Sequence, residues 1–212
     1  EIADGLRREF PVVVVHRAGK LGLGSAVIEG FAAARGAALG VMDADLSHPP
    51  SLLPGMLAAL RGLGVDIVIG SRYIPGGASK NWPFLRRAMS RFACLLARPL
   101  TPVRDATSGL FLVRREAVEG VRISAAGFKI CLELLMRSRI ASVAEVPYVF
   151  ADRAAGESKM TMREAMGYFF QLRDLYVVKF VRDRKPRARY RRVAADELER
   201  MVAGTFSVGP RP

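Results

Sequence analysis

The chain has 212 residues, of which 50% are hydrophobic, so it is long enough to bury one sizeable core, and its length favours one or two domains. Its 33 lysines and arginines outnumber 20 aspartates and glutamates, and the net charge of +13 indicates an anionic partner: nucleic acid, a membrane surface or a phosphorylated substrate. Cys94 and Cys131 have no partner at metal-ligand spacing, so we expect buried free thiols in a reducing, cytosolic setting. No signal peptide opens the chain, and no run of about 18 uncharged apolar residues predicts a membrane-spanning helix.

Strand-like and helix-like patterns alternate through the first half of the chain. Such alternation predicts an α/β sheet with helices on its faces. The expected helices are Glu1–Glu9, Gly24–Arg35, Ser51–Leu63 and Pro83–Ala97, and the expected strands are Val12–Val15, Ala38–Met42 and Val65–Gly70.

The second half is less regular. A polar loop that leads into a strand is expected over Asp105–Val113, a helix at Phe128–Met136, and a strand at Ala144–Phe150. A long helix, Met162–Phe180, is too charged to span a bilayer but apolar enough to lie in a membrane interface. The alternative is that this helix packs onto its own domain.

Seven arginines and lysines crowd residues 182–192, directly after that helix. Such a cluster fits binding to anionic lipid headgroups, with a solvated, disordered tail as the alternative. Binding to nucleic acid is not expected, because Tyr190 is the only aromatic residue in this segment and no nucleic-acid module surrounds it.

Asp43-Ala44-Asp45 directly follows a predicted strand. Two carboxylates one residue apart at a strand end form a compact, hard oxygen site, which suits Mg²⁺ or Mn²⁺ bridging to substrate phosphates. The alternative is a turn, in which aspartate and Ser47 cap the following helix through their side-chain oxygens. The residues alone leave both interpretations open.

Arg17, Lys20 and Gly22 lie in a loop between a predicted strand and a predicted helix. Glycine there lets the backbone approach a ligand, and a helix start attracts anions. The segment 22–26 lacks the third glycine of a dinucleotide fingerprint, so we interpret it as lying near a nucleotide but not as a Rossmann site. Helix capping by Ser25 is the alternative.

Arg72 ends a strand, at the same sheet edge as the aspartates if the two strands are parallel. An arginine there can clamp phosphate oxygens with two hydrogen bonds. Further on, Trp82, Arg86 and Ser90 are spaced four apart and share a helix face, which offers a cation and a hydroxyl group. A salt bridge is the alternative for any single arginine.

Two further loops carry polar side chains. Residues 152–159, which include Arg153 and Lys159, combine cations with a hydroxyl group and a glycine, and such a loop can close over a diphosphate and exclude water. Residues 105–109 offer a carboxylate and two hydroxyl groups suited to sugar or phosphate contacts, with an ordinary turn as the alternative. We interpret His48 as a residue next to the site.

These motifs follow one another in a specific order over about Phe10–Phe180. The segments are Arg17–Gly24, Asp43–Pro50, Gly70–Tyr73, Asn81–Pro83 with Arg86 and Ser90-Arg91, Thr107–Gly109, Gly127–Lys129 with Glu133, and Gly156–Lys159. Together they resemble the polyprenyl-phosphate (dolichol-phosphate) mannosyltransferases, which are inverting family 2 glycosyltransferases. The resemblance implies an α/β GT-A fold, with a Rossmann-like, mixed and mostly parallel sheet, helices on both faces and an amphipathic C-terminal helix. The expected division is a catalytic domain at 1–160, an interface helix at 161–181 and a basic tail at 182–212.

The resemblance also implies roles for single residues. A divalent cation, Mg²⁺ or Mn²⁺, would be held by Asp43, Asp45 and Ser47, where Ser47 stands at a position that is often glutamine in the family. The nucleotide donor would be bound by Arg17, Lys20, Gly22, Asp43, Ala44, Asp45 and Lys159. The acceptor phosphate would be bound by Arg72, Arg86, Ser90 and Arg153. The residues expected to act in catalysis are Asp45, Arg72 and Arg153.

The implied reaction moves mannose from GDP-mannose to polyprenyl (dolichyl) phosphate with inversion, at the cytoplasmic face of a membrane that the protein contacts peripherally. A phosphate nucleophile is already ionised near neutral pH, so no protein base is needed. One alternative keeps the fold and uses UDP-glucose. Another is a non-catalytic module that binds anions or a membrane through its basic tail.

The chain departs from the family in one respect. Family members begin with a strand carrying a Pro-x-Tyr-Asn-Glu segment and a second strand ending in Asp-Asp, and neither occurs here. Glu1 falls where the helix after that second strand would be. Because both segments contact the nucleotide, the resemblance implies incomplete guanine and ribose contacts in this chain.

Overall fold

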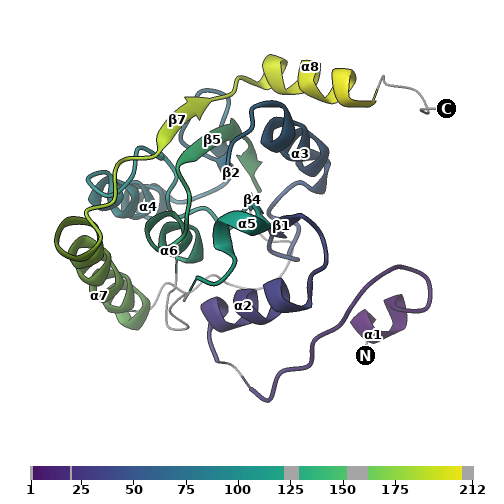
Figure 1. Ribbon diagram of the computed structural model, residues 1–212, viewed down its shortest axis with the longest axis horizontal. Helices are drawn as coiled ribbons and strands as arrows, with labels where there is room; N and C mark the ends of the chain where they lie inside the picture. Colours follow the sequence, from purple (N-terminus) through teal and green to yellow (C-terminus); the bar gives the residue numbers. More distant parts are fainter. Residues whose placement is uncertain (1, 20, 122–128, 152–161, 207–212) are drawn as a thin grey trace.

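The computed structural model describes residues 2–19, 21–121, 129–151 and 162–206 (Figure 1). Its main sheet has five strands in the order β1 (Ala38–Val41), β4 (Phe111–Arg114), β2 (Ile67–Ser71), β5 (Ser142–Pro147) and β7 (Arg189–Arg192). Strand β4 is antiparallel to both β1 and β2, whereas β5 is parallel to β2 and β7. Every strand of this sheet except β4 therefore runs in the same direction, which confirms the mixed, mostly parallel sheet.

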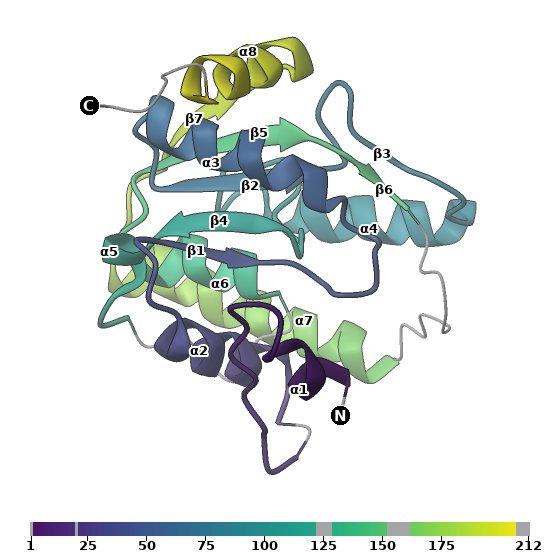
Figure 2. The ribbon, with the colours of Figure 1, turned by 90° about the vertical axis from the view of Figure 1, so that its right-hand side faces the viewer.

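Helices cover both faces of the sheet, as Figure 2 shows. One core layer, around Met56 and Val68, lies under α3 (Leu53–Gly62) and α8 (Ala195–Phe206). The other, around Ile67 and Phe111, receives side chains from α2 (Leu23–Ala33), α4 (Phe84–Ala97), α5 (Arg115–Val118), α6 (Ile130–Arg137) and α7 (Met162–Val177). Strands β2 and β5 are buried at every position, as expected for strands covered on both sides.

Short elements complete the described chain. These are α1 (Ile2–Leu6), the 3₁₀ turn η1 (Pro50–Leu52), the π-helical turn η2 (Val178–Arg182), and the parallel pair β3 (Ala78–Ser79) and β6 (Val149–Phe150). The strand predicted at Ala144–Phe150 is thus divided between two sheets, and Tyr148 lies at the junction. This junction lies next to the candidate site described below.

The strand predicted at Val12–Val15 is wrong. These residues form an irregular arm before α2, and the Val13 side chain is 61% exposed. β-branched residues favour a strand only where a neighbouring strand accepts its hydrogen bonds and a core covers its side chains. No described strand pairs with this arm.

The interpretation of residues 182–206 as part of a tail is also wrong, because they belong to the fold. Strand β7 pairs with β5, and α8 packs against α3 so closely that a Cβ atom on Gly55 would lie 2.9 Å from Leu198 Cγ. Strand β7 was missed because Tyr190 is its single apolar residue, half-buried between exposed arginines. An edge strand can carry so many charges because half of its side chains face solvent.

Helix α7 buries one face and exposes the other. Tyr168, Leu172 and Leu175 join the core, whereas Phe169 and Phe170 are exposed. The helix therefore packs onto its own domain through one face and exposes apolar side chains on the other. Among the described helices, none is long and apolar enough to cross a membrane.

Candidate active site

Several of the predicted site residues meet at one edge of the main sheet. Asp43 follows β1, Arg72 follows β2, and Tyr148 follows β5. Gly109 precedes β4, whose start lies at the same edge because β4 runs in the opposite direction. The prediction that Arg72 shares an edge with the aspartates is confirmed.

The aspartates lie on a tight turn. Leu46 adopts a φ of 62°, a conformation unusual for a side chain other than glycine, and this turns the chain back on itself. As a result, Asp45 Oδ1 accepts hydrogen bonds from the Ser47 backbone nitrogen at 3.1 Å and from Ser47 Oγ at 2.5 Å. Ser47 therefore holds the Asp45 carboxylate in place through both its backbone N–H and its hydroxyl group.

His48 supports the other aspartate. Its Nδ1 accepts the Asp43 backbone N–H at 3.3 Å and lies 3.9 Å from Asp43 Oδ2. The His48 ring is buried against Tyr148 and Phe150, and this burial lowers its pKa, although the negative charge of Asp43 acts in the opposite direction. The neutral imidazole is therefore favoured, and it orients Asp43 without neutralising it.

The donor set of this turn fits a hard divalent cation bound jointly with substrate. Asp43 and Asp45 supply carboxylate oxygens, and the Asp43 side chain is 42% exposed. No third His, Cys, Asp or Glu joins them in a metal-binding cluster within the described residues. Gly109 borders this space, since a Cβ atom there would lie at van der Waals distance from Asp43 Oδ2 (3.5 Å) and His48 Cε1 (3.4 Å). Such a partial set leaves coordination positions for phosphate and water oxygens.

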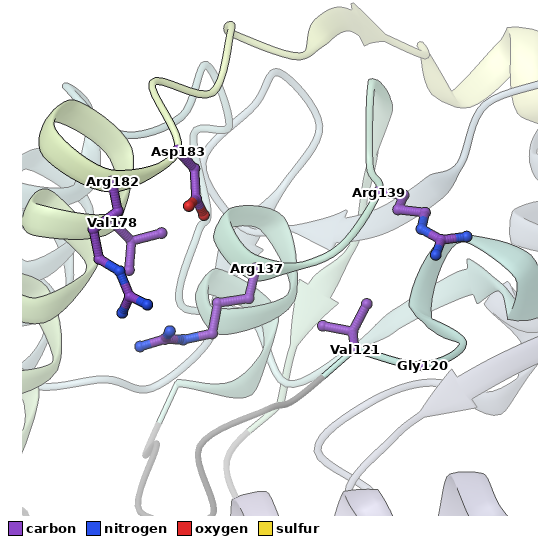
Figure 3. Close-up of a pocket in the computed structure, with 7 residues that line it drawn as sticks. All are labelled: Gly120, Val121, Arg137, Arg139, Val178, Arg182 and Asp183. Atoms are coloured by element: carbon purple, nitrogen blue, oxygen red, sulfur yellow. The ribbon is translucent and has the colours of Figure 1, made fainter.

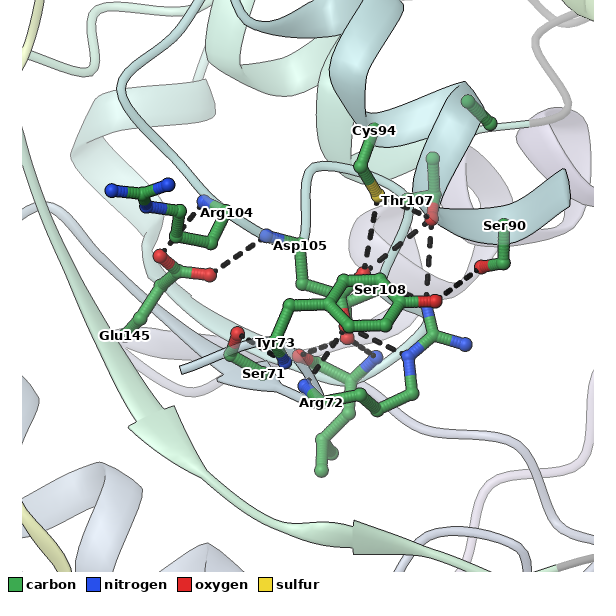
Figure 4. A network of polar contacts seen from close by, with 12 residues as sticks. Ser71, Arg72, Tyr73, Ser90, Cys94, Arg104, Asp105, Thr107, Ser108 and Glu145 are labelled. Carbon is green, nitrogen blue, oxygen red and sulfur yellow. Dashed lines mark hydrogen bonds and ion pairs between the residues drawn. The ribbon is translucent and has the colours of Figure 1, made fainter. Parts of the chain in front are cut away.

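Arg72 is buried and held in a fixed orientation by Asp105, as Figure 4 shows. Its Nε donates to Asp105 Oδ2 and its Nη2 to Asp105 Oδ1, both at 2.7 Å, and its backbone nitrogen donates to Oδ2 at 3.0 Å. Nη2 also donates to Thr107 Oγ1 at 3.3 Å. Nη1 makes no hydrogen bond to any described residue, so it is the nitrogen left for a ligand.

Aromatic rings surround the same guanidinium group. The Arg72 Cζ atom lies 5.2 Å from the centre of the Tyr73 ring, 5.3 Å from that of Trp82 and 5.7 Å from that of Phe150. Burial alone would lower the pKa of Arg72, but the charge of Asp105 and its hydrogen bonds raise it well above the usual value. Arg72 thus remains a cation in apolar surroundings, where an added anion interacts strongly with it.

The other described residues that were predicted to bind the acceptor belong to this cluster. Arg86 Cζ lies 4.1 Å from the centre of the Trp82 ring, and Ser90 Oγ accepts a hydrogen bond from Tyr73 Oη at 2.7 Å. Trp82 and Tyr73 thus connect Arg86 and Ser90 to Arg72. The prediction that these positions lie together is confirmed in its geometry, and their role in binding an acceptor remains a prediction.

The predicted donor residues are only partly described. The Arg17 side chain donates to Glu29 Oε1 at 3.1 Å, to the Gly22 carbonyl oxygen at 3.4 Å and to Ser25 Oγ, so its described hydrogen bonds go to α2 and the turn before it. Gly22 has a φ of 91°, which suits glycine at this turn. The predicted residues outside the described parts of the chain are Lys20, Arg153 and Lys159.

Sequence reasoning missed what Asp105 does. Residues 105–109 were interpreted as a loop suited to sugar or phosphate contacts, whereas the Asp105 carboxylate is fully buried and engaged by Arg72. The two residues are 33 positions apart, so no local pattern signals the pair. Glu145, which holds the Asp105 backbone, was missed for the same reason.

A different hollow, of about 320 Å³, lies between the ends of α5 and α6 and the π-helical turn η2 (Figure 3). Its lining includes Arg137, Arg139 and Arg182 together with Asp183. No residue of the predicted site lines it. The hollow therefore does not change the location of the candidate site.

Comparison with known families agrees with the geometry at the sheet edge. A family model described as glycosyl transferase family 2 matches residues 1–122. The chain belongs to this family. Among solved structures, glucosyl-3-phosphoglycerate synthase from Mycobacterium tuberculosis, in complex with Mn²⁺, UDP-glucose and phosphoglyceric acid, is 24% identical, with a TM-score of 0.51 over 83% of this chain and 58% of that chain. This likeness confirms the GT-A-like fold class.

Curated relatives are more similar in sequence to this member of glycosyl transferase family 2. The dolichol-phosphate mannosyltransferase of Pyrococcus furiosus is 43% identical over 180 residues, covering 83% of this chain and 50% of that protein. The dolichol-phosphate mannosyltransferase of Saccharomyces cerevisiae is 39% identical over 190 residues, covering 85% of this chain and 70% of that protein. The polyprenol monophosphomannose synthase of Mycolicibacterium smegmatis is 41% identical over 180 residues, covering 78% of this chain and 68% of that protein. The chain thus spans 50% to 70% of the length of these relatives.

Proposed function

We propose that this family 2 glycosyltransferase moves mannose from GDP-mannose to a polyprenyl phosphate such as dolichyl phosphate. The observation that carries the proposal is the meeting, at one sheet edge, of the Asp43 and Asp45 carboxylates with the buried Arg72 cluster. Relatives named dolichol-phosphate mannosyltransferase and polyprenol monophosphomannose synthase support the sugar and the lipid.

The arrangement suits a reaction between two anionic substrates. The lipid phosphate oxygen attacks the anomeric carbon from the face opposite the diphosphate, and the new C–O bond forms as the bond to the diphosphate breaks, which inverts the configuration. The nucleophile is ionised near neutral pH, so no side chain needs to remove a proton. Arg72, Arg86 and Ser90 hold the acceptor phosphate and place it in line with the sugar.

Asp43 and Asp45 are the residues that would hold Mg²⁺ or Mn²⁺. When bound, such a cation offsets the negative charge of the donor diphosphate as it leaves. Crystal structures of the neighbouring synthase contain Mn²⁺ with UDP-glucose or Mg²⁺ with UDP, which supports this use of the fold. The proposed donor contacts also include Arg17, Lys20, Gly22, Ala44 and Lys159, and Arg153 completes the acceptor and catalytic set.

The test is a transfer assay with the protein as its natural host makes it. Radiolabelled GDP-mannose and a polyprenyl phosphate are incubated with Mn²⁺ or Mg²⁺, and lipid-linked mannose is measured with and without a chelator. We expect metal-dependent formation of the lipid product. Folded protein that forms no such product from GDP-mannose would contradict the proposal, and UDP-glucose in a parallel reaction would identify a glucosyltransferase.

We further propose that α4 and α7 together form a membrane-contacting surface. The two helices lie side by side, because Tyr168 Oη donates to the Ala93 carbonyl oxygen at 2.7 Å and Tyr176 Oη to that of Leu96 at 2.8 Å. Their exposed apolar side chains include Phe84, Leu85, Phe92 and Leu95 on α4, and Met166, Phe169 and Phe170 on α7. Arg87, Arg91 and Arg173 are exposed on the same helices. Apolar side chains beside arginines suit the boundary between anionic headgroups and acyl chains.

Sedimentation with lipid vesicles tests this surface. The protein is mixed with vesicles that contain or lack phosphatidylglycerol, and the variant Phe92→Asp/Phe169→Asp is compared with Ile2→Asp, which changes an even more exposed apolar side chain on α1. We expect the double variant to lose binding and the α1 variant to keep it. Equal binding by both variants would contradict the proposal, as would a concentration-dependent dimer that the double variant abolishes.

A further inference from the structure

A buried carboxylate lies behind the candidate site without a cation partner. Glu145, on β5, is fully buried, and no described lysine, arginine or histidine forms an ion pair with it. Its Oε2 accepts hydrogen bonds from the Tyr190 hydroxyl group at 2.6 Å and from the Arg104 backbone nitrogen at 2.8 Å. Its Oε1 accepts one from the Asp105 backbone nitrogen at 2.9 Å. Burying a carboxylate that is stabilised only by hydrogen bonds is costly, which points to a role for the groups that it binds.

The two backbone N–H groups that Glu145 binds belong to the segment that carries Asp105. Figure 4 shows Glu145 facing this segment from one side, while the Asp105 side chain meets Arg72 on the other. A continuous hydrogen-bonded path therefore runs from Tyr190 through Glu145 and the backbone of Asp105 to the Arg72 guanidinium group. Its first member lies on β7, in the segment that the sequence suggested to be a tail.

Strand pairing fixes the two outer members of this path. Strands β5 and β7 are parallel, with Val143 opposite Tyr190, and the Val193 backbone nitrogen donates to the Glu145 carbonyl oxygen at 2.9 Å. Tyr190 and Glu145 thus lie on rigid elements, whereas residues 104–105 lie in a loop between α4 and β4. A loop tied to a strand in this way keeps its side chains more precisely placed than a free loop does.

We propose that Glu145 and Tyr190 are positioning residues for the acceptor-phosphate site. They fix the backbone at Arg104 and Asp105, so that Asp105 presents Arg72 in one orientation with Nη1 directed to the ligand. This inference rests on the proposed function, in which Arg72 binds the lipid phosphate. It gives β7 a role in catalysis without contact to either substrate.

Steady-state kinetics of Tyr190→Phe and Glu145→Gln test the inference. Tyr190→Phe removes one donor and keeps the ring, and Glu145→Gln places an amide N–H group against a backbone N–H. We expect the KM for polyprenyl phosphate to rise about 5- to 10-fold, as for the loss of roughly one hydrogen bond, while the KM for GDP-mannose changes by less than about twofold. Acceptor and donor must be varied separately, because a purely structural role would not single out the acceptor.

Glu133→Gln is the matched control, because Glu133 is also buried but accepts hydrogen bonds from Arg137 on α6 and Gln171 on α7 and is not part of the path to Arg72. We expect its acceptor KM to equal that of the unaltered protein. An unchanged acceptor KM in Tyr190→Phe, or an equal rise in all three variants, would overturn the inference. An unaltered protein that forms no lipid-linked mannose would instead refute the proposed function, so the two failures are distinguishable.

Discussion

The two halves of the candidate site are built in opposite ways. The Arg72 side chain is 8% exposed and pairs with a fully buried aspartate, whereas the Asp43 carboxylate is 42% exposed and lies 3.9 Å from a histidine whose neutral form is favoured. The protein surrounds the Arg72 guanidinium group with its own side chains, but it leaves the exposed Asp43 carboxylate accessible to a ligand. Under the proposed function, this difference predicts that the acceptor site is pre-organised and that donor binding depends on the cation that accompanies the donor.

Because of this difference, substitutions around Arg72 and substitutions around Asp43 should affect stability and activity differently. A residue that completes the Arg72 half serves both the fold and the site, so its loss should lower stability and activity together. A residue of the Asp43 half serves the ligand, so its loss should lower activity alone. The following variants test that separation.

The largest loss of stability is expected for Asp105→Asn. This change leaves the Arg72 guanidinium group buried without its counter-charge, and breaking such a pair costs about 3–5 kcal/mol in the free energy of unfolding. Denaturant unfolding measures the loss. The control is Asp196→Asn, which removes the exposed Asp196–Arg200 ion pair on α8 and should leave stability unchanged. Equal stability of the two variants would show that Arg72 does not depend on Asp105.

Asp43→Asn should affect activity alone. Removal of one charge from the turn weakens cation binding, so we expect transfer to fall at least about 100-fold, while the midpoint of thermal unfolding stays the same. Initial rates at several Mn²⁺ concentrations and a thermal melt of the same preparation check both parts. A clear drop in the unfolding midpoint would break the contrast between the two halves.

Gly77→Ala should disturb the Arg72 half through the backbone. A Cβ atom on Gly77 would lie 2.4 Å from the Ser71 carbonyl oxygen and 2.9 Å from the Arg72 carbonyl carbon, so the chain must move. We expect a loss of about 1–3 kcal/mol in the free energy of unfolding, together with weaker acceptor binding. Gly62→Ala is the control, because nothing lies within 4 Å of its added Cβ atom. A Gly77→Ala variant as stable as the control would contradict this reading of the backbone.

The smallest expected effect is on the reactivity of Cys94, which lies next to the Arg72 cluster. Its Sγ lies 3.3 Å from Thr107 Oγ1 and 3.8 Å from Asp105 Oδ1, and burial raises the pKa of the thiol to about 11. We expect no reaction with a thiol reagent at pH 8 in the folded protein, and measurable reaction in Asp105→Asn. Cys131 is also buried and serves as the internal reference, to be followed by mass spectrometry of digested protein. Rapid labelling of Cys94 in the unaltered protein would show that this half is not tightly closed.

The features that the sequence predicted well are those written in local patterns. Alternation of strands and helices predicted the layered α/β sheet, and polar residues at the ends of Ala38–Met42 and Val65–Gly70 predicted the site edge, because β1 and β2 run in the same direction. The four-residue spacing of Trp82, Arg86 and Ser90 likewise predicted one cluster.

The features that escaped prediction depend on distant partners. Val12–Val15 has strand-forming residues but no described neighbour, and Arg189–Arg192 is a strand because β5 lies beside it. Asp105 and Glu145 gain their roles from residues 33 and 40 positions away, respectively. Local propensity carries no information about such pairs. The residues that support Arg72 were therefore harder to predict than the aspartates.

Calorimetric titration with each substrate, with and without a chelator, tests the central claim most directly. A short-chain polyprenyl phosphate and GDP-mannose are titrated separately into the protein in buffer that contains Mn²⁺ or excess chelator. We predict that binding of the lipid phosphate survives chelation, because the protein itself completes the Arg72 cluster, and that binding of GDP-mannose is lost. Lipid binding that disappears with the metal, or donor binding that does not need it, would contradict the division of the site into these two halves.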